Sequence, residues 1–130
     1  MRDTAEDTIV DIAGRYTREE KTMKFTTLIP TRRNDGSKVK PSELVGLINK
    51  LFHAFGAYTI EGKVKGVWMD EGKTYHDECL KIVIACEEDK LELAQRLVIE
   101  IGRQLGQLAM YFEIDRTSEV RNLRIEKRSP

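Results

Sequence analysis

The densest cluster of groups able to bind a ligand is a basic loop at residues 31–40. It holds Arg32, Arg33, Lys38 and Lys40, and its local charge is +3 once its one aspartate is counted. Cationic groups at this density attract anions, so the loop is a candidate contact for a phosphate, a nucleotide or another small anion. The simpler interpretation is a solvated loop, because an Asn-Asp-Gly turn signal lies within it.

A second candidate is Gly62-Lys-Val-Lys-Gly-Val-Trp68, whose spacing resembles the phosphate loop of acylphosphatases. In such a loop, consecutive backbone amides cradle an anion. The acylphosphatase loop joins a strand to a helix and is followed by an arginine, whereas here Met69, Asp70 and Glu71 follow. Two glycines that bend a long strand explain the segment better.

Polar groups also gather in Tyr75-His-Asp-Glu78, where His76 and Glu78 share one face of an expected strand. Their spacing matches no metal motif, so we expect no metal and no cofactor. His53 lies opposite the apolar face of its expected helix. No serine or cysteine stands beside it to form a nucleophile–base pair. We therefore expect no catalytic residue, and the sequence favours a protein that is not an enzyme.

The composition describes a soluble globular protein of one domain, with 130 residues, 40% of them apolar and 34% charged. No apolar run approaches the roughly 18 residues that cross a bilayer, so we expect no membrane contact. Cys79 and Cys86 fall on one expected strand, about 23 Å apart at about 3.3 Å per residue. That is too far for a disulfide. Free thiols, and an N-terminus without a signal-peptide core, favour the cytoplasm.

Hydrophobic periodicity predicts the order strand, helix, strand, strand, helix, strand between Met23 and Ile114. The expected ranges are residues 24–29, 41–55, 58–69, 74–86, 87–105 and 108–114. This order is typical of the ferredoxin-like α+β fold, a split β-α-β sandwich of four antiparallel strands with two helices on one face.

The chain divides into three expected parts. Residues 23–114 form the ferredoxin-like domain. Residues 1–22 form an N-terminal arm in which Ile9, Ile12 and Tyr16 follow helical spacing, which favours a short helix over a disordered arm. Residues 115–130 form a C-terminal extension, either an edge strand or a mobile tail.

Alternation along the two long strands predicts which side chains lie under the helices. One set is Tyr58, Ile60, Val64 and Trp68, and the other is Leu80, Ile82, Ile84 and Cys86. Together with the helix stripes, they predict a core that includes Leu47, Leu51, Trp68, Leu80, Ile82, Leu97 and Ile101. The opposite parity is half polar, as an antiparallel sheet allows on its outer face. Gly62 and Gly66 indicate a bulge or bend in the first of these strands.

Nucleic-acid binding is not favoured. Lys plus Arg equals Asp plus Glu, 22 each, and phosphate-driven binding needs a cationic excess. RNA-recognition domains share this strand order and stack bases on aromatic residues of their first and third strands. The expected third strand, which begins Tyr75-His-Asp-Glu, lacks that aromatic motif.

A wider resemblance covers about residues 25–114. Gly66-Val-Trp68 before an acidic turn, Tyr75, Glu78 and Arg103-Gln-Leu-Gly-Gln-Leu-Ala-Met-Tyr111 are similar to an uncharacterised family of small bacterial ferredoxin-like proteins. Members carry a glycine-any-tryptophan before a hairpin and an arginine-phenylalanine-glycine-glutamine-glutamate run before the last strand. Leu105 and Leu108 depart from that run. The resemblance implies the fold and a bacterial source, and no activity.

These patterns favour a non-enzymatic protein-interaction or regulatory module that forms a homo-oligomer through its bare sheet face, most simply a dimer. The expected contact residues are Leu28, Val67, Val83 and Tyr111, with Ile12 and Tyr16 of the arm as an alternative cover. Two other functions remain open. One is a domain that senses an amino acid or anion, and the other is an accessory protein that contacts nucleic acid through the basic loop and tail.

Overall fold

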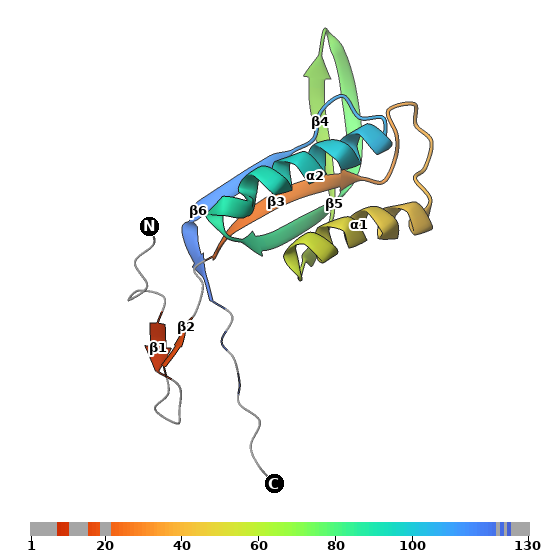
Figure 1. Ribbon diagram of the computed structural model, residues 1–130. Coiled ribbons are helices and arrows are strands. Elements are labelled where there is room, and N and C mark those ends of the chain that lie inside the picture. The colour runs from red at the N-terminus through yellow and green to blue at the C-terminus, as the bar shows by residue number, and fades with distance from the viewer. Residues whose placement is uncertain (1–7, 11–15, 19–21, 122, 124, 126–130) are drawn as a thin grey trace.

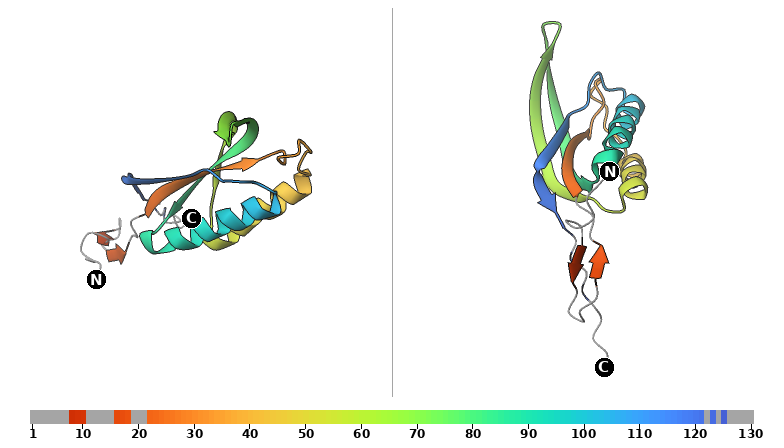
Figure 2. Two further views of the ribbon diagram at one scale, coloured as in Figure 1. Left: turned by 90° about the horizontal axis from the view of Figure 1, so that it is seen from above. Right: turned by 60° about the vertical axis from the view of Figure 1, so that its left-hand side comes forward.

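The computed structural model describes residues 8–10, 16–18, 22–121, 123 and 125. Its elements are β1 (Thr8–Val10), β2 (Tyr16–Arg18), β3 (Thr22–Pro30), α1 (Pro41–Phe55), β4 (Thr59–Asp70), β5 (Lys73–Cys86), the 3-10 turn η1 (Glu88–Lys90), α2 (Leu91–Gln104) and β6 (Phe112–Val120). One antiparallel sheet has the strand order β4-β5-β3-β6. Both helices cover one of its faces (Figures 1 and 2). The predicted ferredoxin-like fold is confirmed.

Helix α1 has the bounds that the sequence predicts. Pro41 stands at its first turn, where the missing N–H removes no helical hydrogen bond. The helix ends before Gly56, whose N–H donates to the carbonyl of Phe52 at 2.7 Å. In the described residues, no helix combines the length and the apolar character needed to cross a membrane.

The core lies between the helices and the covered face of the sheet, around Phe25. This ring is fully buried, edge-on to Phe55 at 5.3 Å and stacked with Phe112 at 5.1 Å. Four residues of the predicted core are buried there: Leu47, Leu51, Ile82 and Ile101. Leu80 and Leu97 are half-buried against the same cluster. Trp68 is not part of it, and a bulge in β4 explains why.

The bulge places one extra residue in β4. Ile60 pairs with Ile82, but Gly62 pairs with Lys81, so Glu61 has no partner of its own. Gly62 has φ of 125°, a backbone conformation that a residue with a side chain rarely adopts. Because side chains alternate between the two faces of a strand, one extra residue moves every later side chain to the opposite face.

The expected faces of β4 are therefore wrong beyond the bulge. Val64 pairs with Cys79 and Trp68 with Tyr75, on the face away from the helices, which we call the open face. Lys63, Lys65 and Val67, expected on the open face, point the other way. The expected faces of β5 are confirmed, since Ile82 and Ile84 are buried under the helices and Val83 and Ala85 pair with β3 on the open face.

A helix in the N-terminal arm was the wrong prediction for residues 8–10 and 16–18. β1 and β2 form a separate antiparallel sheet in which Val10 pairs with Tyr16. The physical reason is the run Thr8-Ile9-Val10, since β-branched residues favour strands and outweigh the helical spacing of the stripe. Ile12 lies outside the described residues. Figure 1 shows this small sheet beyond one end of the four-stranded sheet.

The last strand also differs from its expected range. β6 begins at Phe112, not at residue 108, and continues to Val120. The carbonyl of Tyr111 accepts a hydrogen bond from the Thr27 hydroxyl at 2.8 Å instead of joining the strand.

Strand pairing resumes after an irregularity at Asp115, whose carboxylate accepts hydrogen bonds from Thr117 and Ser118. These bonds lower the pKa of Asp115 to about 2. β6 thus crosses residue 115, and the division of the chain into three parts stays a prediction.

The core assignment predicts a contrast within α1. Leu51→Ala should lower the free energy of unfolding by about 2–5 kcal/mol, because it leaves a cavity beside Phe25. Val45→Ala is the matched control, because Val45 is 58% exposed on the same helix and its change should stay within about 0.5 kcal/mol. Urea denaturation measures both. Equal losses for the two variants would show that the buried face of α1 is misassigned.

Candidate functional site

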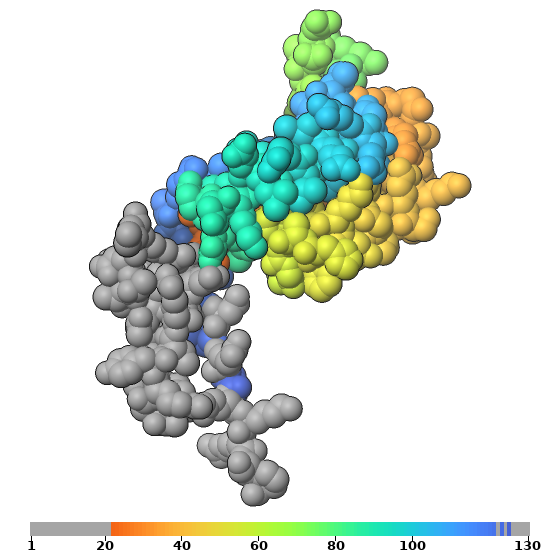
Figure 3. Space-filling model, in the orientation of Figure 1, coloured from red at the N-terminus to blue at the C-terminus, as the bar shows by residue number. Residues whose placement is uncertain are grey.

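The part of the chain that stands out from the two-layer body is the outer half of the β4–β5 hairpin. Figures 1 and 3 show its tip projecting beyond the helices and the rest of the sheet. Val67 and Met69, on one face of this hairpin, are 66% and 70% exposed. The other face is continuous with the open face of the sheet and carries the aromatic residues.

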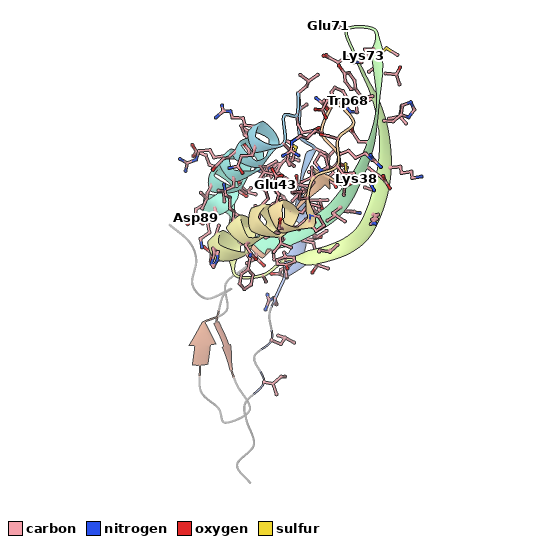
Figure 4. All side chains as sticks on the ribbon, turned by 90° about the vertical axis from the view of Figure 1, so that its right-hand side faces the viewer. Lys38, Glu43, Trp68, Glu71, Lys73 and Asp89 are labelled. Atoms are coloured by element: carbon pink, nitrogen blue, oxygen red, sulfur yellow. The ribbon has the colours of Figure 1, made fainter. Side chains whose placement is uncertain are left out.

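An aromatic pair occupies that face. The rings of Trp68 and Tyr75 stack with centroids 4.6 Å apart and an angle of 18° between their planes. The indole N–H of Trp68 donates to Oδ2 of Asp77 at 2.6 Å. The ammonium group of Lys73 lies 5.0 Å from the centroid of the Tyr75 ring, a cation–π distance. Figure 4 shows Trp68 and Lys73 on the hairpin below its tip at Glu71.

A cavity of about 310 Å³, which we call the hairpin pocket, lies beside this pair. The hairpin forms one wall, the end of β3 the second, and the segment from α2 to β6 the third. Its lining residues are Leu28, Pro30, Gly66, Val67, Trp68, Asp77, Cys79, Gln107, Ala109, Met110 and Tyr111. A mostly apolar cavity with a few polar groups is the usual form of a small-molecule site.

Sequence patterns could not reveal this pocket. Its walls come from three segments far apart in the chain, and Trp68 reaches it only through the bulge at Gly62. The one signal in the sequence was the pair of glycines in β4, which predicted a bulge without indicating which residue is extra.

Cys79 lines the hairpin pocket but is a poor nucleophile. Burial raises the pKa of its thiol from 9.0 to about 11, and the nearby carboxylate of Asp77 adds to this effect. Cys86 is buried on the covered face, and burial raises its pKa to about 11 as well. Since the thiolate is the reactive form, neither residue is suited to covalent catalysis.

We therefore expect slow alkylation of both cysteines in the folded protein. A pKa raised from 9.0 to about 11 reduces the thiolate fraction at pH 8 about a hundredfold. Mass spectrometry should show iodoacetamide reacting at least about a hundredfold more slowly with the native chain than with the urea-unfolded chain. Comparable rates in the two states would contradict the burial of these thiols.

The cluster at residues 75–78 is divided between the two faces of β5. Asp77 faces the hairpin pocket, whereas His76 pairs with Val67 and Glu78 with Lys65 on the other face. Among the described residues, no three His, Cys, Asp or Glu side chains are placed to hold a metal ion.

The basic loop is partly neutralised by its own surroundings. The Arg33 guanidinium forms an ion pair with Glu43 at 2.5 Å, and Arg32 lies 3.9 Å from Glu78. The backbones of Arg32 and Lys38 form an isolated antiparallel β-bridge. The side chains of Lys38 and Lys40 are exposed. An anion contact at this loop stays a prediction.

The expected interface residues fall on more than one surface. Leu28 and Val83 are half-buried on the open face, and Tyr111, 51% exposed, stands at its margin beside Leu28 in the hairpin pocket. Val67 points to the opposite side of the sheet, on the other face of the hairpin. Tyr16 belongs to β2, and Ile12 lies outside the part of the chain that the structure describes.

A larger groove of about 640 Å³ runs between α2 and the segment that leads into β6. It is lined mainly by apolar residues, including Val98, Leu108 and Met110, and Arg103 is its charged group. Among the described residues, no carboxylate or thiol lines this groove, so the hairpin pocket has the more varied set of polar groups.

Comparison with known proteins supports the fold. No family model matches the chain, and no curated protein matches it. Among solved structures, the chain is similar to CutA1 from Oryza sativa, with a TM-score of 0.56 and 11% identity over 82% of this chain and 85% of that chain. Membership of the bacterial family that the sequence resembles, and a bacterial source, stay predictions. The chain is a small protein with the ferredoxin-like fold, and its architecture is similar to that of CutA1.

Proposed function

We propose that this protein is an interaction module that associates with a second copy of itself through the open face of its sheet. The observation that carries the proposal is the one-sided cover of the sheet, since both helices lie on the same face (Figure 2). An exposed sheet face with apolar residues is a common interface, and two such faces pack about 10 Å apart.

The composition of the open face supports a partner with the same surface. Its centre is formed by Thr26, Leu28, Val83 and Ala85 of the two inner strands. Two pairs of opposite charge flank them. Lys81 forms an ion pair with Glu61 at 3.1 Å, and Lys24 pairs across the strands with Asp115.

Two copies of such a face would not repel each other. The chain as a whole is also neutral, with 22 basic and 22 acidic residues. In a two-fold arrangement each surface meets its own equivalent, so a face with balanced charges is compatible with self-association.

The test is the mass of the protein in solution. Light scattering at tens of micromolar should give twice the mass of one chain or more. Val83→Glu should dissociate the complex, raising its dissociation constant more than tenfold, because the substitution places a carboxylate from each copy in an apolar contact.

Val45→Glu is the matched control. It makes the same substitution at an exposed valine on α1, away from the open face, and should leave the mass unchanged. A wild-type chain that stays monomeric, and remains so after removal of residues 1–21, would contradict the proposal. Dissociation by Val45→Glu and not by Val83→Glu would also contradict it.

A further inference from the structure

Asp77 in the hairpin pocket is an acidic group without a cationic partner. Its Oδ2 accepts the Trp68 indole N–H, and no ion pair joins it to a Lys or Arg among the described residues. The residue is half-buried. A carboxylate removed from water is costly unless a positive charge or further hydrogen bonds compensate it, so the pocket favours a cationic ligand.

Gly66 leaves the space over this carboxylate empty. Gly66 is the direct cross-strand partner of Asp77, where side chains normally stand about 5 Å apart. Its φ is not positive, and a Cβ built on it meets nothing within 4 Å. Neither backbone conformation nor crowding therefore requires glycine here. The consequence of glycine is open access to Asp77.

The walls suit a cation that carries an apolar stem. The Trp68–Tyr75 stack presents aromatic surface beside the carboxylate, and it already attracts the Lys73 ammonium. Leu28, Pro30 and Met110 supply aliphatic contacts on the opposite walls.

Gln107 adds a neutral acceptor. Its amide nitrogen is directed at the carbonyls of Leu105 and Arg32, at 3.3 and 3.4 Å. This orientation leaves its amide oxygen available to accept a hydrogen bond from a ligand.

We propose that the hairpin pocket binds a small organic cation, an alkylammonium or alkylguanidinium group with a short carbon stem. Asp77 balances the charge, Trp68 contacts the cationic head and the aliphatic walls hold the stem. A volume of about 310 Å³ lies at the lower end of the range of small-molecule pockets, about 300–1,000 Å³, so the site suits a small ligand. The pocket shares Leu28 with the open face through which we propose self-association, whereas Val83, at the centre of that face, does not line the pocket.

The fluorescence of Trp68 tests the proposal directly, because it is the one tryptophan in the chain. Titration with butylguanidinium or butylammonium should change the emission of Trp68 in a saturable way. Butylurea, a neutral analogue of similar shape, should not. Isothermal titration calorimetry provides an independent readout of the same binding.

Asp77→Asn should weaken binding at least tenfold and preserve the fold, because the asparagine carbonyl can still accept the Trp68 N–H. Gly66→Val should block the site by filling it, and valine suits a strand. Asp70→Asn is the control for charge, since Asp70 ends β4 on the same hairpin but does not line the pocket. Circular dichroism verifies the fold of each variant.

Val83→Glu should bind the cation as the wild type does, which separates this proposal from the self-association of the chain. Three results would overturn it: no saturable response to either cation, an equal response to butylurea, or unchanged binding in both Asp77→Asn and Gly66→Val.

Discussion

The insertion of one residue at Glu61 is the constraint on which the surfaces of this protein depend. It is possible because Gly62 adopts a φ of 125°. Before the bulge, β4 directs Ile60 toward the helices. After it, the same strand directs Val64 and Trp68 to the open face, where they meet Cys79 and Tyr75. The projecting hairpin gains an aromatic face from this change.

The change of face links the fold to its candidate site. With Trp68 on the open face, the indole reaches Asp77, and Gly66 stands opposite that carboxylate. The hairpin then closes a pocket against β3 and the segment before β6. The centre of the open face lies further along the inner strands, around Val83. The open face of the one sheet therefore carries both proposed contacts: the centre around Val83 for a second copy, and the hairpin pocket for a small cation.

Sequence patterns predicted those features that depend on local periodicity. The order of elements, the bounds of α1 and the burial of Ile82 follow from spacing along single segments. The sequence analysis placed Trp68 on the wrong face of β4. The alternation of side chains predicts a face only while the strand has no extra residue, and the glycines do not indicate which residue is extra. The start of β6 was also misplaced. The Thr27 hydroxyl donates a hydrogen bond to the Tyr111 carbonyl, at a position where backbone pairing between strands was expected.

Disulfide trapping measures the register of β4 directly. Residues directly opposite each other in an antiparallel pair have Cα atoms about 4.5–5.5 Å apart, within reach of a disulfide. In a chain that also carries Cys86→Ala, Val64→Cys should crosslink to Cys79 on oxidation, and Lys63→Cys should not, because the bulge pairs Val64 with Cys79. Without the extra residue, Lys63 would stand opposite Cys79. Peptide mass spectrometry that finds the disulfide in Lys63→Cys and not in Val64→Cys would contradict the account.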